Sequence, residues 1–315
     1  MNVSRREFVS LFGAGAALAA APGCVGLPSR RTNAKIALQL YSLYKYIGGE
    51  ESADGNVVKP GVGFAKAFRA LSAIGYEGVE FCDYYGNDAR TIRAILNDNG
   101  LKAVGAHVGG WRQIEGDKLK VVAEFQLELG NNILICPGGT GPDGMDWKNP
   151  KWDAKCAEHM KFITEFFNER ADTAAKLGCR VGIHNHQWEF QLKDEDGVSF
   201  WDHFFSNTTK DVLMEQDVGW TTCAGRDPCE EFLKYPGRSP LIHAKENGMG
   251  VGVSSFDGIL GRPGKPGAKP VDWDTLVPAA VDNGTEWFVV ECERHFDDLS
   301  AVTPSYGFLR SKGLS

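Results

Sequence analysis

Four segments of the chain close an apolar run with a residue that can bind a metal ion or carry a proton. They are HNH at residues 184–186, Asp217 in LMEQDVGW, His243 in LIHAKE and Glu291 in FVVECE. A barrel of parallel strands builds its active site from residues at the carboxyl ends of different strands. Two segments that carry imidazole and two that carry carboxylate therefore indicate one divalent metal ion at such a site.

The HNH segment offers two imidazoles on one face, because residues i and i+2 of a strand point the same way. A lone histidine is more often structural than functional, but the pair His184 and His186 at a strand end favours a role in the site. Glu189 follows closely. It would either contact a substrate or orient one of the imidazoles.

Asp217 follows the apolar residues 212–214. An unpaired carboxylate at such a depth is costly, so a cation or a hydrogen-bond donor should lie close to it. The alternative is that Asp217 caps the helix that follows.

The last two strands supply further candidates. His243 and Lys245 share one face of their strand, and Lys245 would either stabilise an anionic intermediate or pair with a carboxylate. Glu291 comes after four apolar residues and is the strongest candidate for the base that moves a proton. Glu293 has the same strand parity, so the two carboxylates could exchange roles.

Several polar and aromatic residues near other strand ends are suited to holding a sugar. Gln39, Tyr41, Glu80 and His107 could form hydrogen bonds with hydroxyl groups, and Trp220 could stack on a sugar ring. An aromatic residue beside a barrel strand is at least as often part of the core.

The spacing of the apolar runs predicts the fold. Eight short runs alternate with helical patterns, which favours a closed (β/α)8 TIM barrel over an open doubly wound sheet. A long connection rich in Gly and Pro, residues 246–270, lies on the carboxyl-end side and could serve as a substrate lid. The expected strands are 36–41, 78–81, 103–108, 132–136, 180–184, 212–216, 241–244 and 287–291.

Composition argues against several classes of partner. The chain has 34 Lys and Arg against 41 Asp and Glu, a net charge of -7, and no basic run follows its N-terminal segment. Nucleic acid and anionic membrane surfaces are therefore not expected partners. None of the eight cysteines stands in a CxxC spacing. Buried free thiols are expected rather than a disulfide framework, although an exported location would permit a bond such as Cys223 to Cys229.

The N-terminal segment has the pattern of an export signal. Arg5 and Arg6 precede an uncharged apolar run at residues 11–21, which is too short to span a bilayer. We expect residues 1–33 to be a twin-arginine signal and linker, residues 34–315 to be one barrel domain, and the mature protein to be periplasmic. An alternative is that the signal ends at a lipidated Cys24, the one membrane contact that the sequence suggests.

Eight segments together resemble the xylose isomerase-like barrel proteins, also called the sugar phosphate isomerase/epimerase family. These segments are IALQLYSL, IGYEGVEF, AVGAHVG, VGIHNHQWEF, EQDVGW, LIHAKE, PVDWDTLV and FVVECE, and they extend over residues 36 to about 296. In that family a single Mn²⁺, Co²⁺, Mg²⁺ or Zn²⁺ is held by Glu, Asp, His and Glu from the last four strands. The resemblance implies Asp217, His243 and Glu291 as ligands. The family's strand-five Glu is absent, so His184 or His186 must take its place, or the ion has fewer protein ligands.

The resemblance implies a sugar isomerase or epimerase in which an acid and a base act beside a carbonyl that the ion polarises. A histidine, His184 or His186, opposite Glu291 could replace the second carboxylate of this pair. A lyase or hydrolase acting on a keto-sugar is equally compatible. A phosphodiesterase similar to endonuclease IV and a non-catalytic sugar-binding protein are further alternatives. The expected partner is a small sugar, and the sequence leaves open whether the chain forms a homo-oligomer.

The export hypothesis has a direct test. Replacing both Arg5 and Arg6 by Lys should leave the precursor in the cytoplasm, because twin-arginine export requires the paired arginines. Cell fractionation measures the distribution, and export of the variant at the normal level would reject the hypothesis.

Overall fold

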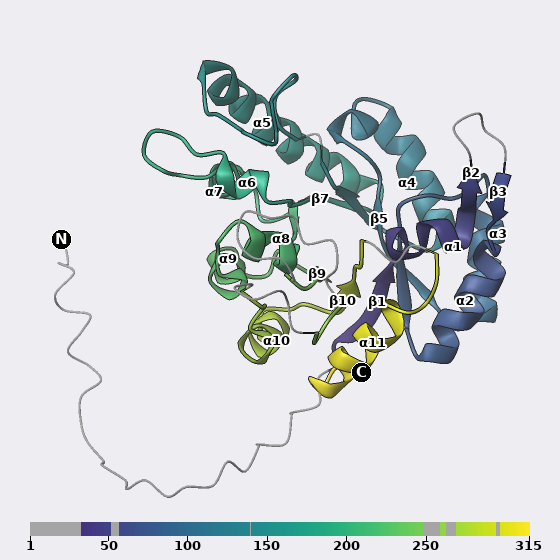
Figure 1. Cartoon of the computed structure of the whole chain (residues 1–315). Coiled ribbons are helices and arrows are strands. Elements are labelled where there is room, and N and C mark those ends of the chain that lie inside the picture. Colours follow the sequence, from purple (N-terminus) through teal and green to yellow (C-terminus); the bar gives the residue numbers. More distant parts are fainter. Residues whose placement is uncertain (1–32, 52–56, 139, 248–258, 263–268, 294–296) are drawn as a thin grey trace, which may run out of the picture. The chain divides into compact units, whose positions relative to one another are not determined.

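A computed structural model describes residues 33–51, 57–138, 140–247, 259–262, 269–293 and 297–315. Eight parallel strands form a nearly closed barrel with helices on its outside, so the predicted (β/α)8 fold is confirmed (Figure 1). The barrel strands are β1 (Lys35–Gln39), β4 (Gly78–Phe81), β5 (Lys102–His107), β6 (Ile133–Cys136), β7 (Arg180–His184), β8 (Leu213–Glu215), β9 (Leu241–Ala244) and β10 (Trp287–Val290).

The strands lie side by side in the order β8-β7-β6-β5-β4-β1-β10-β9. The two ends of this order meet through a parallel bridge between Asp217 and His243, and the amide of His243 donates to the carbonyl of Gln216 at 2.9 Å. The seam of the barrel is therefore closed by two of the predicted metal ligands.

The helices that cover the barrel begin and end at recognisable signals. Asp88, Asp153 and Ser199 each accept a backbone N–H at a helix start, which satisfies donors that the helix itself leaves free. Gly75 ends its helix at φ 119°, the left-handed conformation that favours glycine. The longer helices are α2 (Gly63–Ile74), α3 (Ala89–Asp98), α4 (Lys118–Leu129), α5 (Ala154–Lys176), α7 (Phe200–Asn207), α10 (Trp273–Asp282) and α11 (Val302–Ser311).

Short elements fill several connections that the sequence pattern did not resolve. An antiparallel hairpin of β2 (Gly49–Glu51) and β3 (Val57–Pro60) lies in the connection between β1 and α2. The other short elements are η1 (Leu40–Leu43), α1 (Tyr44–Gly48), η2 (Trp111–Ile114), α6 (Trp188–Gln191), α8 (Val218–Cys223) and α9 (Pro228–Lys234).

The barrel interior has an apolar layer below a polar one. The apolar layer contains Ala37, Leu213, Leu241 and Val289 among its members. Residues two and four positions further along each strand face the same way. The polar side chains of Gln39, Glu215, Asp217, His243, Lys245, Glu291 and Glu293 therefore lie above this layer, toward the carboxyl ends.

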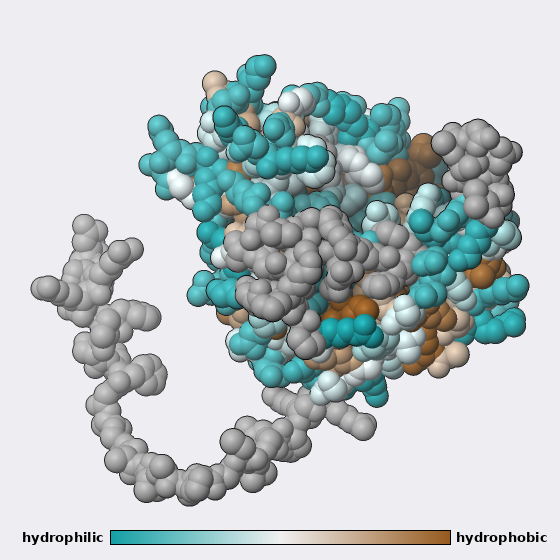
Figure 2. All heavy atoms as spheres, in the orientation of Figure 1, coloured by the Kyte–Doolittle hydropathy of each residue, from teal (hydrophilic) through white to brown (hydrophobic). Residues whose placement is uncertain are grey.

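Most of the hydrophobic core lies between the barrel and its helices. The backbone N–H of Ser315 donates to the carbonyl of Ala34 at 3.0 Å, so the last residue of the chain is joined to the entrance of β1. Hydrophilic side chains cover the outer surface around α5 and α7 (Figure 2). None of the described helices is long and apolar enough to cross a membrane.

Two sequence expectations fall partly or wholly outside the described residues. These are the signal at residues 1–33 and most of the expected lid at residues 246–270. No disulfide joins the seven cysteines within the described residues, Cys223 and Cys229 included, as the sequence favoured.

Gly182 tests how tightly the site strands are packed. A Cβ atom at this position would lie 2.4 Å from the carbonyl oxygen of Leu213, which is backbone and cannot move aside. Gly182→Ala should therefore lower the free energy of unfolding by about 1–3 kcal/mol, the usual cost of overpacking a core. Denaturant unfolding measures the change.

Gly307→Ala is the matched control. It lies in α11 with nothing within 4 Å of the added Cβ, so it should stabilise by about 0.5–1 kcal/mol through helix propensity. Equal stabilities for Gly182→Ala and the unaltered protein would contradict the close approach of β7 and β8.

Candidate active site

A cavity of about 810 Å³ opens at the carboxyl ends of the strands. Its walls combine titratable and aromatic side chains, and its volume is in the range of small-molecule sites. The lining includes Tyr41, His107, His184, His186, Trp220 and Glu291.

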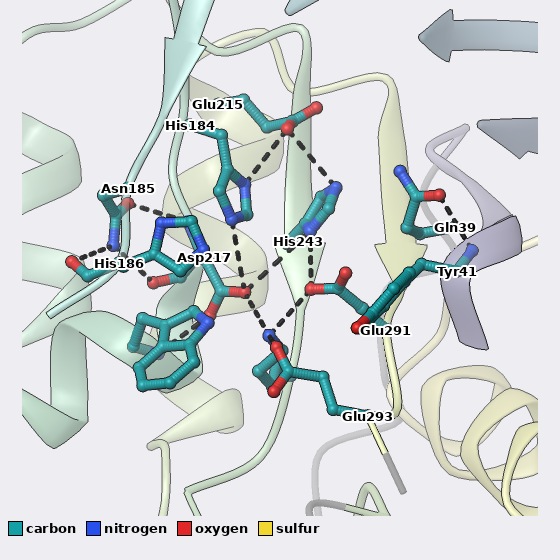
Figure 3. Close-up of polar contacts among 12 residues, drawn as sticks. Gln39, Tyr41, His184, Asn185, His186, Glu215, Asp217, His243, Glu291 and Glu293 are labelled. Carbon is teal, nitrogen blue, oxygen red and sulfur yellow. Dashed lines mark hydrogen bonds and ion pairs between the residues drawn. The ribbon is translucent and has the colours of Figure 1, made fainter. Parts of the chain in front are cut away.

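Four residues from four strand ends converge beside this cavity, and we call them the outer group (Figure 3). Each offers one ligand atom, and these atoms all lie within 4.8 Å of one another. His243 Nδ1 lies 3.2 Å from Glu291 Oε2 and 3.9 Å from Asp217 Oδ2, and His184 Nε2 lies 4.0 Å from the same Asp217 oxygen. The outer group consists of His184, Asp217, His243 and Glu291, the four residues predicted to hold a metal ion.

Asp217 combines the two roles that its sequence position suggested. Its Oδ1 accepts the backbone N–H of Trp220 at 2.8 Å and so caps α8. Its Oδ2 points toward the imidazoles of the outer group and lies 3.1 Å from Lys245 Nζ (Figure 3). The helix cap fixes the carboxylate, and the second oxygen has a cation beside it.

Lys245 supplies positive charge beside the outer group. Its Nζ lies 2.7 Å from Glu291 Oε2 and 3.1 Å from Asp217 Oδ2, and it also contacts Glu293. Lys245 is 2 % exposed. Burial lowers the pKa of this ammonium, but the carboxylates of Asp217, Glu291 and Glu293 outweigh it and raise the pKa of Lys245 well above its usual range.

The same contacts keep Glu291 ionised. Burial raises the pKa of the Glu291 carboxyl, but the nearby charges of Lys245 and His243 outweigh burial and hold that pKa well below its usual range. Burial has the larger influence on Glu293 and raises its pKa. The two carboxylates share a strand face, as expected, but their pKa values shift in opposite directions. Glu291 is stabilised in its ionised form by the charges of Lys245 and His243 together.

A second set of ligand atoms lies deeper in the barrel, and we call it the inner group: His107, His184, Glu215 and His243. Glu215 Oε2 lies 2.7 Å from His107 Nε2, 3.1 Å from His184 Nδ1 and 3.3 Å from His243 Nε2. His243 Nε2 also lies 2.6 Å from Glu80 Oε2. His184 and His243 therefore belong to both groups, each through its two different ring nitrogens.

Glu215 was missed at the level of sequence. It stands two residues before Asp217 in LMEQDVGW and shares its strand face, and this parity was the available signal. Burial raises the pKa of Glu215 well above its usual range, and the nearby charge of Glu80 acts in the same direction.

His186 lines the cavity next to the outer group. Its ring centre lies 5.1 Å from that of His184 and 5.5 Å from that of Trp220. Glu189 is fully buried behind it and accepts the backbone N–H of His186 at 2.8 Å. Burial lowers the pKa of His186, but the nearby carboxylates of Glu189 and Asp217 together outweigh burial and raise that pKa. Glu189 therefore lies behind His186, with its Oε1 3.9 Å from the imidazole Nδ1, and it is not among the described residues that line the cavity.

The residues expected to hold a sugar fall into two sets. Tyr41, His107 and Trp220 line the cavity. Gln39 and Glu80 are fully buried, and Gln39 Nε2 donates to Glu80 Oε2 at 2.9 Å while its Oε1 accepts the backbone N–H of Tyr41. The second set, to which Glu189 also belongs, holds other site residues in place and does not line the cavity.

Comparison with known proteins identifies the family. The sequence profile described as "Xylose isomerase-like TIM barrel" matches residues 68–312. The chain belongs to this family. Members of the family often bind a divalent metal ion, and the outer group could hold one.

Individual relatives are distant. Inosose dehydratase of Erwinia tasmaniensis is 24% identical over 256 residues, which cover 73% of this chain and 83% of that protein. A sugar phosphate isomerase/epimerase structure from Parabacteroides distasonis superposes with a TM-score of 0.65 at 21% identity, covering 88% of this chain and 98% of that one. The 3-keto-D-glucoside 4-epimerase of E. coli superposes with a TM-score of 0.58 at 15% identity, covering 88% and 99%. These structures share the fold of this chain.

The outer group fits the metal ion that the family implies. Two imidazole nitrogens and two carboxylate oxygens form a donor set that suits Mn²⁺, Co²⁺ or Zn²⁺. Asp217 is fully buried, and its Oδ2 lies 4.0 Å from His184 Nε2 and 3.9 Å from His243 Nδ1, separations longer than hydrogen bonds and within twice a metal–ligand bond of about 2.0–2.2 Å.

Proposed function

We propose that the protein is a divalent-metal-dependent sugar isomerase or epimerase that acts on an unphosphorylated sugar or keto-sugar. The observation that carries this proposal is the outer group beside an open cavity, with Glu291 lining that cavity and His186 as a second proton-carrying group. When bound, a divalent ion would polarise a substrate carbonyl and acidify the adjacent C–H.

Glu291 is the proposed base. The low pKa that Lys245 and His243 impose keeps its carboxylate ionised and able to accept a proton from the carbon next to the carbonyl. The electrons of that C–H bond pass to the carbonyl and give an enediolate. Lys245 lies within ion-pair distance of Glu291 and would stabilise negative charge there. His186 would donate a proton to the enediolate, at the opposite face of the same carbon in an epimerase or at the neighbouring carbon in an isomerase, since imidazole exchanges protons near neutral pH.

Two features of the cavity support an uncharged sugar. Among the described lining residues Lys148 is the single Lys or Arg, whereas a phosphate group is usually bound by several cationic side chains. Tyr41, Trp147, Trp188 and Trp220 also line the cavity and offer faces on which a sugar ring can stack.

A keto-glycoside lyase or hydrolase is a second candidate. Its support is the similarity to a dehydratase and the fold shared with a 3-keto-D-glucoside epimerase. Both chemistries begin with the same proton abstraction. Mass spectrometry of the product separates them, because isomerisation leaves the mass unchanged whereas elimination or hydrolysis changes it.

The proposed metal centre predicts how variants lose the ion. We expect one divalent ion per chain, and Asp217→Ala or His243→Ala should weaken its binding by at least about tenfold, since even supporting groups contribute that much. Elemental analysis after dialysis against a defined free Mn²⁺ concentration measures occupancy. Full occupancy in both variants would reject the assignment.

Glu291→Gln tests the proposed base. The amide keeps the shape and one oxygen but cannot accept the proton, so exchange of the substrate C–H with D₂O should fall about 100-fold or more while substrate binding survives. NMR of keto-sugars in D₂O measures the exchange. The control Glu286→Gln changes an exposed carboxylate just before the same strand and should leave exchange unchanged.

The histidine variants locate the second proton carrier. Near-normal exchange in Glu291→Gln together with its loss in His184→Ala or His186→Ala would place the base on β7 instead. Equal losses in all three would indicate that protons are handled from both faces of the sugar.

The site of action is also a proposal. The twin-arginine pattern at residues 4–9 supports export to the periplasm, with lipidation of Cys24 as an additional anchor to be examined by mass spectrometry of the mature N-terminus.

A further inference from the structure

Glu215 has no role in the function proposed above, yet it lies at the centre of the inner group. The residue is 1 % exposed and does not line the cavity. Its Oε2 is within 3.3 Å of ring nitrogens from His107, His184 and His243. A buried carboxylate costs free energy unless donors surround it, and these rings are the donors available.

Glu215 and Glu80 each offer an acceptor to one nitrogen of a shared ring. In a ring that binds a metal ion through one nitrogen the hydrogen lies on the other, and here those other nitrogens face carboxyl oxygens: His184 Nδ1 faces Glu215 and His243 Nε2 faces Glu80. A neutral imidazole then has its one lone pair on the opposite nitrogen. These are His184 Nε2 and His243 Nδ1, the two atoms that point toward Asp217 and Glu291 in the outer group.

We propose that Glu215 is a positioning residue that presents the lone pairs of His184 and His243 to a metal ion in the outer group, with Glu80 completing the support of His243. A histidine that donates from its second nitrogen to a carboxylate has a fixed tautomer and ring orientation, and it is a more basic ligand. This inference rests on the metal centre proposed above, but not on the sugar reaction.

The ion could instead sit in the inner group itself, with Glu215 as a direct ligand. A neutral ring cannot serve both positions at once, because it has a single lone pair. The outer position is favoured because Glu291 lines the cavity, whereas Glu215 and Glu80 lie behind it. Experiment can separate the two arrangements.

The first measurement is metal affinity in the absence of any sugar. Mn²⁺ and Co²⁺ dissociation constants are determined by chelator competition for the unaltered protein and for Glu215→Gln. We expect binding about 10–100-fold weaker in the variant, the usual cost of losing such a support, while the Co²⁺ absorption bands keep their positions. Thermal unfolding of both metal-free proteins checks that the variant folds.

The matched control is Glu246→Gln. Glu246 is another buried carboxylate, but the hydrogen bonds that hold it come from Trp273 Nε1 and the backbone N–H of Val271. Its replacement should leave metal affinity within about twofold of normal.

The second measurement repeats the comparison in a His184→Ala background. If Glu215 acts through His184, the penalty of Glu215→Gln should shrink markedly there, because residues that act through one another are not additive. A full penalty in that background, with shifted Co²⁺ bands in the single variant, would make Glu215 a direct ligand and overturn the inference.

Unchanged affinity in Glu215→Gln would overturn it as well. Absence of ion binding by the unaltered protein would instead remove the metal centre on which the proposed function also rests. A third outcome is that the unaltered protein binds the ion and Glu215→Gln binds it more weakly, as expected, but no sugar exchanges a proton. That result would leave this inference standing and reject the proposed reaction.

Discussion

Five carboxyl groups converge at the carboxyl ends of the strands, and their mutual repulsion has to be balanced. Asp217, Glu291 and Glu293 lie within ion-pair distance of Lys245, whereas Glu80 and Glu215 lie beside the imidazoles of His107 and His243. Buried like charges raise one another's pKa, and a nearby cation lowers it. The opposite shifts of Glu215 and Glu291 follow from this, because Lys245 lies beside Glu291 and Asp217 but is not among the contacts of Glu215.

The two shared imidazoles connect the buried charges to the cavity. His184 and His243 each place one nitrogen among the inner carboxylates and the other in the outer group. Rotation of either ring would break a contact on both sides. The buried carboxyl groups of Glu215 and Glu80 therefore fix the orientation of both rings. A divalent ion at the outer group would add positive charge beside the carboxylates of Asp217 and Glu291.

The fold gives this arrangement its rigidity. An apolar layer that includes Leu213, Leu241 and Val289 fills the barrel below the site, and the seam between β8 and β9 is joined at Asp217 and His243. A site built on strand ends of a packed barrel holds its groups more precisely than one built on loops. The same scaffold carries isomerases and dehydratases among the relatives, so the reaction depends on the few residues above the apolar layer.

The sequence by itself determined the fold and most of the candidate site. Apolar runs of strand length predicted all eight barrel strands, and the residue that closes each run identified the outer group, because the carboxyl ends of parallel strands meet at one face. The sequence could not show that His184 and His243 bridge two groups or that Glu215 lies among three imidazoles, since those contacts join β5, β7, β8 and β9 and depend on barrel register. Only the tertiary structure placed Gln39, Glu80 and Glu189 behind the cavity wall, because strand parity tells which face a side chain takes but not how deep in the barrel it lies.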